Sequence, residues 1–176
     1  MVTKFTDEFD ATIRDAVLRG WVGCDWLFFK AQRQAETGGE KDPVHAVSST
    51  GAKGLFQLMP SVCAQFKVID PFDPKENARG AVEAMSSIWT QFMRESDMER
   101  MKLSWAGYNC GEHHVFAAQK LAEAAGVDSR IWDNVQPFLA QLTKPEGSRA
   151  MSDDSVNQVT DYVARILNYY NQLKAS

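Results

Sequence analysis

The apolar residues of this chain recur every three or four positions along almost its whole length. This spacing constrains the fold more than any other feature, because it places apolar side chains on one face of an α-helix. No stretch keeps the two-residue alternation that is typical of a half-buried strand. With 176 residues, the chain is long enough for one domain with a proper core and too short for two comfortable ones. We therefore predict a single all-α domain over residues 1–176.

Glycines, prolines and polar clusters divide this pattern into separate helices. The expected helices span residues 5–18, 24–37, 61–66, 74–95, 98–109, 113–125, 129–142 and 153–173, with a short helix or two turns at 52–59. Asp73 and Pro74 are typical of a helix N-cap and first helical position. Gly111 is expected to separate two of the helices, and residues 38–50 and 143–151 are expected to form surface loops.

The helix expected at 24–37 carries Glu36 in its last turn. Gly38 and Gly39 follow, and we expect them to end the helix because glycine adopts the left-handed C-cap conformation without steric cost. The negative end of the helix dipole and apolar surroundings both favour the protonated form of a carboxyl group there. Cleavage of a glycosidic bond requires such a protonated acid. These residues alone also fit a surface glutamate at a frayed helix end.

Composition excludes several classes of partner. Hydrophobic residues make up 44% of the chain and charged residues 24%, which is typical of a soluble globular protein. The net charge is −4 and no basic run exceeds a pair, so we expect no nucleic-acid partner. No segment offers the roughly 18 consecutive apolar residues of a membrane span, and the acidic residues near the N-terminus argue against a signal peptide. We expect a monomer without stable membrane insertion.

The sequence predicts neither a metal site nor a cofactor. His113 and His114 are adjacent, and neighbouring helix positions diverge by about 100°, so they rarely share one ion. No further ligand has a matching spacing. The three cysteines, Cys24, Cys63 and Cys110, are far apart and odd in number. One disulfide is possible, and buried thiols are the alternative for Cys24 and Cys63.

Three motifs follow one another along the chain. They are Glu36-Thr37 with Ser48-x-x-Gly51-Ala52-x-Gly54-Leu55-x-Gln57-x-Met59-Pro60, then Tyr108-Asn109-Cys110-Gly111, then Tyr162-Val163. In order and spacing they resemble the soluble lytic transglycosylases, a family of peptidoglycan-cleaving enzymes related to goose-type lysozymes. The resemblance runs from about residue 22 to about residue 170. It implies an all-α, lysozyme-like catalytic domain with a substrate cleft.

The resemblance also implies roles for individual residues. Glu36 would protonate the glycosidic oxygen and then accept a proton from the sugar, whose 6-hydroxyl closes a 1,6-anhydromuramic acid ring without water. The implied substrate-binding residues are Ser48, Gln57, Met59, Tyr108, Asn109 and Tyr162. Three of them have plainer interpretations: Ser48 as a turn former, Asn109 as a helix cap and Tyr162 as a core residue. Glu40, in the loop after Glu36, is expected to have no catalytic role.

The chain departs from the family pattern in places. Thr37 replaces the usual serine, the loop before Ser48 is longer, Gly107 replaces an alanine, and Gln158 stands where many relatives carry a further glutamate. Two other functions therefore stay open. A goose-type muramidase would use a second carboxylate to activate water, with Asp42, Asp70, Asp73 and Asp161 as the candidates. A non-catalytic cell-wall-binding or virion structural module would need no acid.

The expected partner is the peptidoglycan glycan strand, which lies outside the cytoplasmic membrane. The expected lack of a signal peptide conflicts with that location. A phage endolysin made in the cytoplasm and released to the cell wall would resolve the conflict. A protein carried on a virion, or a domain cut from a longer chain, would resolve it equally well.

Overall fold

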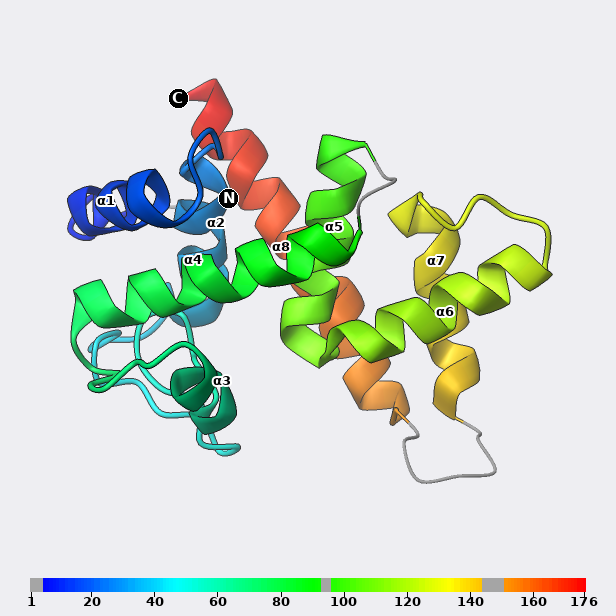
Figure 1. Ribbon diagram of the computed structural model, residues 1–176, viewed down its shortest axis with the longest axis horizontal. Coiled ribbons are helices and arrows are strands. Elements are labelled where there is room, and N and C mark those ends of the chain that lie inside the picture. The colour runs from blue at the N-terminus through cyan, green and yellow to red at the C-terminus, as the bar shows by residue number, and fades with distance from the viewer. Residues whose placement is uncertain (1–4, 93–95, 144–150) are drawn as a thin grey trace. The chain divides into compact units, whose positions relative to one another are not determined.

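The structure is a computed structural model that describes residues 5–92, 96–143 and 151–176. Over these residues the secondary structure is helical, with two isolated β-bridges and no strand. The helices labelled in Figure 1 are α1 (Asp10–Gly20), α2 (Leu27–Thr37), α3 (Pro60–Gln65), α4 (Pro74–Gln91), α5 (Asp97–Cys110), α6 (Glu112–Ala124), α7 (Trp132–Leu139) and α8 (Asp153–Ala175). The 3₁₀-helix η1 (Ala140–Thr143) follows α7. The all-α prediction is confirmed.

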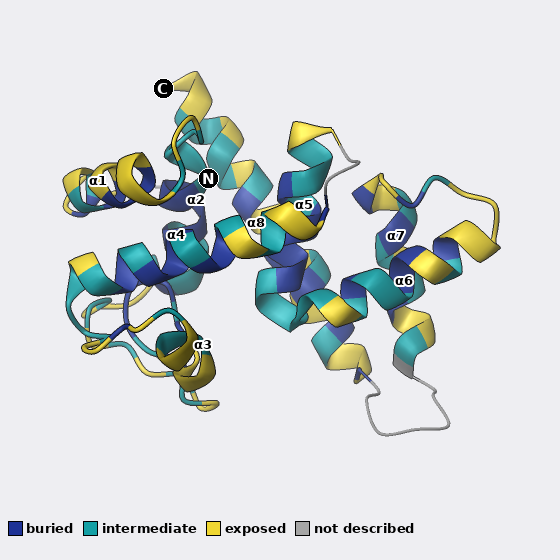
Figure 2. Ribbon diagram, in the orientation of Figure 1, coloured by how far each residue is buried: buried dark blue, intermediate teal, exposed yellow. Residues whose placement is uncertain are grey.

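The chain divides into two compact units. The first comprises Met1–Ser86 and Arg165–Ser176, and so contains α1, α2, α3, most of α4 and the C-terminal half of α8. The second comprises Ser87–Ala164, with the end of α4, then α5, α6, α7, η1 and the start of α8. Figure 2 shows the buried positions of the longer helices as dark blue bands, whereas α3 has none.

Aromatic side chains form the centre of the first unit. Phe29 of α2 is almost fully buried and meets Phe56 edge-on, with ring centroids 6.3 Å apart. Trp21, in the turn after α1, meets Phe29 at 6.1 Å. Burial of one such side chain contributes roughly 1.5–3 kcal/mol. This cluster joins α2 to the segment that contains Phe56.

Helix α2 buries polar residues that the apolar pattern did not predict. Of the apolar residues at helical spacing, only Ala31 is buried, and Cys24, Leu27, Phe28 and Ala35 are half-buried. Lys30, Gln32 and Arg33 are buried. The Lys30 ammonium donates to the carboxylates of Asp7 and Asp10, and the hydrogen bond from Lys30 lowers the pKa of Asp7. Long side chains bury their stems while their polar ends reach a partner, so charged residues occupy positions that a hydrophobicity pattern assigns to solvent.

Residues 46–58 form a compact set of turns, here called the 46–58 segment. Lys53 makes antiparallel bridges to both Val47 and Leu58. The φ angles of Gly54 (74°) and Gln57 (49°) lie in the left-handed region, which a right-handed helix does not contain. Of the short helix or two turns expected at 52–59, the structure has turns, at residues 54–57, and no helix. The next expected helix is confirmed as α3.

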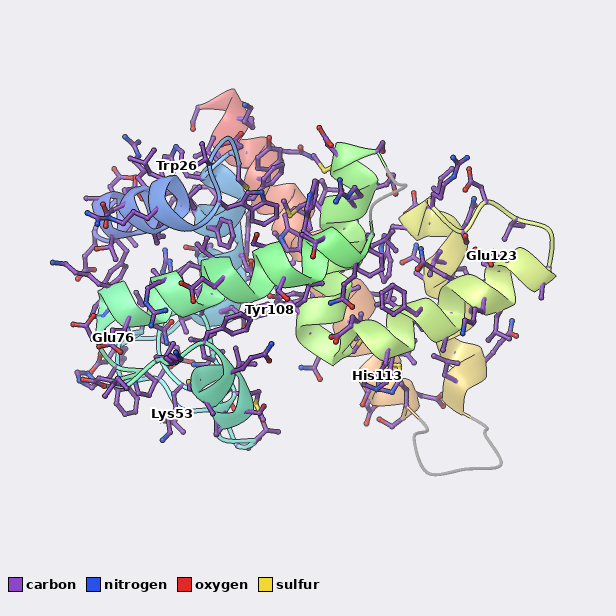
Figure 3. The ribbon with its side chains drawn as sticks, viewed as in Figure 1. Trp26, Lys53, Glu76, Tyr108, His113 and Glu123 are labelled. Carbon is purple, nitrogen blue, oxygen red and sulfur yellow. The ribbon has the colours of Figure 1, made fainter. Side chains whose placement is uncertain are left out.

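The 46–58 segment is anchored to α4 by Asn77, which is fully buried. The Asn77 side-chain amide donates to the carbonyl oxygens of Lys53 at 3.0 Å and Pro71 at 2.8 Å. Its oxygen accepts a hydrogen bond from the Phe56 amide at 2.9 Å. A Cβ at Gly54 would lie 2.2 Å from the Pro71 oxygen, so the chain approaches as closely as a glycine permits. Lys53 and Glu76 of this region are labelled in Figure 3.

Several helix boundaries differ from the prediction. The Asp73 cap is confirmed, since its carboxylate accepts the amides of Lys75 at 2.8 Å and Glu76 at 2.9 Å. Helix α1 begins at Asp10 rather than near residue 5, because a turn precedes it. The helix expected at 129–142 is shorter, because Ile131 is extended and η1 forms its end. The expected end of α4 near residue 95 and most of the expected 143–151 loop lie outside the described residues.

The second unit has its own core, in which α6 and α7 lie side by side (Figure 1). Phe92 and Phe116 contact each other with ring centroids 5.0 Å apart. The Trp132 amide at the start of α7 donates to the Glu99 carboxylate of α5 at 2.7 Å. Gly111 has a φ of 90° between α5 and α6, which confirms it as the separator of these helices.

Candidate active site

Glu36 lies in the last turn of α2 and is half-buried, as the sequence predicted. The reason that the helix ends there is different from the expected one. Gly38 has φ −66° and ψ −17°, so it does not adopt the left-handed conformation. A Cβ at Gly38 would instead lie 2.4 Å from the Gln34 carbonyl oxygen. The glycine permits a close approach of the chain, and Glu36 lies two residues before it.

Thr37 fixes the end of α2 to the 46–58 segment. Its hydroxyl is buried and donates to the Leu55 carbonyl oxygen at 2.9 Å. The Arg33 carbonyl oxygen, one helical turn back, lies 3.4 Å away. The Thr37 hydroxyl therefore links the end of α2, which carries Glu36, to the 46–58 segment.

A cavity of about 270 Å³ opens beside Glu36 within the first unit. It is lined by Glu36, Thr37, Glu40, Ala46, Val47, Ser48 and Gln57. Three of the predicted site residues, Glu36, Ser48 and Gln57, are thus brought together. They come from α2 and the 46–58 segment, which are separated by the eight residues 38–45 and are placed side by side only by the tertiary fold.

Ser48 both lines this cavity and forms a turn. Its hydroxyl oxygen accepts the Ala52 amide at 3.0 Å and shares a hydrogen bond of 2.9 Å with the Thr50 hydroxyl. The main chain repeats the link, because the Ser48 amide donates to the Ala52 carbonyl oxygen at 2.9 Å. The interpretation of Ser48 as a turn former is confirmed, and its contact with substrate stays a prediction.

Gln57 is held by the backbone rather than left free for substrate. Its side-chain nitrogen donates to the carbonyl oxygens of Gly54 at 2.9 Å and Ala46 at 3.3 Å. The nitrogen is therefore occupied by backbone carbonyl oxygens, and the contact of Gln57 with substrate stays a prediction. The side-chain oxygen is left to meet a ligand. A non-glycine residue with φ 49° is also typical of functional sites, where the surrounding structure maintains the strain.

Met59 lies outside the cavity. It is 40% exposed and immediately precedes α3, in extended conformation. Its predicted role in substrate binding would therefore be at the surface beside the cavity, where a thioether can provide an apolar contact.

Glu40 is the residue that the sequence interpretation missed. It lines the same cavity as Glu36 and is exposed. A turn places it there, since the Glu40 amide donates to the Thr37 carbonyl oxygen at 3.1 Å. Glu36 and Glu40 are four positions apart, but this spacing does not predict that they share one face, because the helix ends between them. No other sequence feature indicates that this carboxylate lies at the cavity.

The acids that the sequence did single out are occupied elsewhere. The hydrogen bond from His45 lowers the pKa of Asp42, and the Asp70 carboxylate accepts the Phe72 amide at 2.9 Å. Asp73 caps α4, and Asp161 is an exposed residue of the second unit. None of these four lines the Glu36 cavity.

The remaining predicted residues belong to the second unit. Tyr108, labelled in Figure 3, and Asn109 lie in the last turn of α5, and Tyr162 is buried on α8. Gly111 rather than Asn109 caps α5, so the interpretation of Asn109 as a cap is wrong. A second cavity, of about 200 Å³, is lined by Asn109, Cys110, His114, Met151, Ser155, Gln158 and Val159. The roles of Tyr108, Asn109 and Tyr162 toward Glu36 and substrate stay predictions.

The cysteines are free thiols. Burial raises the pKa of Cys24 and of Cys110 to about 12, and it also raises that of Cys63. A thiol that holds its proton is a poor nucleophile, so none of the three is suited to covalent catalysis. Over the residues described, His, Cys, Asp and Glu side chains form no group of three that could hold a metal ion. No helix in the same residues is long and apolar enough to cross a membrane.

Comparison with known proteins shows the family to which this chain belongs. Residues 25–130 match the family described as "Transglycosylase SLT domain". A membrane-bound lytic murein transglycosylase F from Desulfosudis oleivorans is 32% identical over 155 residues, which cover 86% of this chain. The chain belongs to the transglycosylase SLT family. A relative of the same description from Alteromonas mediterranea is 29% identical over 156 residues.

Solved structures of similar proteins show the same fold. An inactive variant of the lytic transglycosylase Slt from Pseudomonas aeruginosa superposes on 97% of this chain with a TM-score of 0.65 and 19% identity. The 70 kDa soluble lytic transglycosylase of Escherichia coli has the same TM-score and identity over 96% of the chain. The predicted lysozyme-like helical fold is confirmed. This SLT chain spans about a third of the length of the curated relatives named above (34% and 32%).

Proposed function

We propose that this SLT chain is a lytic transglycosylase that cleaves the β-1,4 bond between N-acetylmuramic acid and N-acetylglucosamine in peptidoglycan. One observation carries the proposal. Within the family match, Glu36 lies in the last turn of α2, beside a cavity that Ser48 and Gln57 also line. A carboxyl group that is half-buried at a cavity wall can give a proton to a bound glycosidic oxygen and take one back.

The proposed reaction needs one carboxyl group and no water. Glu36 donates its proton to the glycosidic oxygen as the bond from that oxygen to C1 of the muramic acid breaks. The 6-hydroxyl oxygen of the same sugar bonds to C1, and its proton passes to the Glu36 carboxylate. Glu36 is thereby returned to its starting form, and the product carries a 1,6-anhydro ring. Holding the hydroxyl close to C1 makes ring closure intramolecular, which favours it strongly over attack by a free group.

The 46–58 segment would bind and orient the sugar beside Glu36. The Gln57 side-chain oxygen can accept a hydrogen bond from a sugar hydroxyl or acetamido N–H, because the nitrogen of the same amide is bound to the backbone. Thr37 prevents relative movement of the acid and this segment by its bond to Leu55. The carboxyl group therefore faces a wall of fixed shape, as proton transfer in a transition state requires.

A second candidate function is favoured by Glu40. A muramidase that inverts the sugar would place a water between two carboxyl groups, and Glu36 and Glu40 line one cavity. In that reaction Glu36 would protonate the leaving oxygen while Glu40 accepted a proton from water. The product would be a hydrated reducing end.

The Glu36→Gln variant tests the assignment of the acid. The amide keeps the volume of the side chain but cannot donate its proton as an acid, so we expect a loss of at least a hundredfold in the rate of peptidoglycan cleavage, the order of general acid–base contributions. The unfolding temperature should stay near that of the wild type. Glu83→Gln is the matched control, because Glu83 forms only a surface ion pair with Arg79. Near wild-type clearing of a peptidoglycan gel by Glu36→Gln would exclude this acid.

The Glu40→Gln variant distinguishes the two reactions. A lytic transglycosylase should keep its rate within a few-fold, because no step uses Glu40. A muramidase with Glu40 as its base should lose activity by a similar factor to Glu36→Gln. A protein that binds purified peptidoglycan but releases no fragments, even as wild type, would instead be a cell-wall-binding module.

We further propose that residues 1–176 work as one catalytic domain. In support of this, the family match at 25–130 includes residues of both compact units. Neither unit alone contains all the residues that the resemblance assigns to the site.

A further inference from the structure

Gln32 of α2 has a buried amide group that lacks a hydrogen-bond partner. The residue is fully buried, and neither its side-chain nitrogen nor its side-chain oxygen has a partner among the residues described. An unsatisfied buried amide destabilises a fold, and an apolar side chain of the same size would avoid that cost. Buried groups of this kind call for an explanation, and a role in catalysis is one. No proposed step has so far used Gln32.

Gln32 and Glu36 lie on the same face of α2. They are four positions apart in one uninterrupted helix, Leu27–Thr37. Residues with this spacing have Cβ atoms roughly 5–6 Å apart, and their side chains can hydrogen-bond to each other. Helical side chains also lean toward the N-terminus of the helix. The Glu36 side chain therefore leans toward the turn that carries Gln32.

Three polar side chains that line the Glu36 cavity make hydrogen bonds within the protein. The Thr37 hydroxyl donates to Leu55, and the Gln57 nitrogen donates to two carbonyl oxygens. The Ser48 hydroxyl is bonded to Thr50 and Ala52. Gln32 differs from all of these, because both ends of its amide are uncommitted one turn behind the acid.

We propose that Gln32 is a positioning residue that holds the Glu36 carboxyl group during the reaction. This inference rests on the proposed function, because it takes Glu36 as the acid and base. An amide suits the two steps, since its nitrogen is a donor to both forms of the acid. It donates to the Glu36 oxygen that does not carry the proton, which leaves the O–H of the acid for the glycosidic oxygen, and it donates to the carboxylate that then takes the proton from the sugar. The partner that the amide lacks in the free protein is supplied when substrate closes over Glu36.

The test replaces the amide with apolar groups of similar size. Gln32→Met and Gln32→Leu should unfold at the wild-type temperature or above, because they remove an unpartnered buried polar group. Their kcat on soluble, peptide-free glycan strands should fall on the order of ten- to a hundredfold, with KM changed by less than about twofold. Only a group that acts on the bound transition state separates kcat from KM in this way.

Gln119→Met is the matched control. Gln119 is a buried glutamine of α6 whose amide is satisfied, since its nitrogen donates to the Ser129 carbonyl oxygen at 2.8 Å. We expect the opposite pattern there, a lower unfolding temperature with kcat unchanged per folded molecule. Wild type and Glu36→Gln are measured in the same assay, so that failure of the proposed function is seen separately as an inactive wild type or an active Glu36→Gln.

Two results would overturn the inference about Gln32. One is a kcat within about twofold of wild type for either folded Gln32 variant, beside an inactive Glu36→Gln. The other is a large fall in unfolding temperature, or failure to fold, in both variants. That second result would show that the amide is structural, because an unpartnered amide cannot be needed for folding.

Discussion

Two glycines of the 46–58 segment are required for different reasons. Gly51 has φ 88° with open space around its Cα, whereas Gly54 has φ 74° and no room for a side chain. A Cβ at Gly54 would lie 2.2 Å from the Pro71 oxygen and 2.4 Å from the Asn77 amide nitrogen. The left-handed conformation alone costs a non-glycine residue roughly 1–2 kcal/mol. Crowding adds to that cost only at Gly54.

The Gly51→Ala and Gly54→Ala variants separate these two effects. We expect Gly51→Ala to lower the free energy of unfolding by roughly 1 kcal/mol, and Gly54→Ala to lower it by roughly 3 kcal/mol or more. Urea denaturation of both variants measures the difference. Equal losses would mean that the contact with Pro71 is easily relieved and that conformation alone explains both glycines.

At the scale of the element, Asn77 determines where the 46–58 segment lies. Removing its side chain leaves the buried Phe56 amide and two carbonyl oxygens without their partner. We expect Asn77→Ala to cost roughly 3–5 kcal/mol of stability and to speed hydrogen exchange at the Phe56 amide. Asn134→Ala serves as the control, because that side chain makes a single bond, to Asp128. Unchanged exchange at Phe56 would show that α4 does not anchor this segment.

Such elements show how far the sequence could predict the site. The end of α2 was predictable, because periodicity and two glycines mark it locally. The 46–58 segment was not, because its turns depend on Asn77, nineteen positions beyond its end. Glu40 was missed for the same reason, since a turn after the helix brings it to the cavity. Gln32 could not be singled out from the sequence, because a glutamine at a buried helix position belongs to no recognisable motif.

At the scale of the whole molecule, stability should fall in alkaline solution. Burial and the hydrogen bond to Asp25 raise the pKa of Tyr170 to about 12, and burial raises those of Cys24 and Cys110 to about 12. The folded state then keeps protons that the unfolded state releases from about pH 8.5 for cysteine and about pH 10 for tyrosine. Stability is therefore fully present below about pH 8.5 and is lost as the pH rises toward 12.

Thermal unfolding between pH 7 and pH 11 checks this prediction. Tyr170→Phe should flatten the decline above about pH 10, because it removes the group that titrates there. Tyr169→Phe is the control, since its ring packs against Phe5 and makes no bond to Asp25. An identical decline in Tyr170→Phe and wild type would assign the loss to other groups.

In the proposed reaction, Glu36 completes the cleavage without water. The most direct test digests purified peptidoglycan in heavy-oxygen water and analyses the released fragments by mass spectrometry. We predict fragments with 1,6-anhydromuramic acid ends, each one water lighter than a hydrolysis product and free of the label. Hydrated reducing ends that carry the heavy oxygen would contradict the account, and would show that a second carboxylate, with Glu40 the first candidate, activates water in the same cavity.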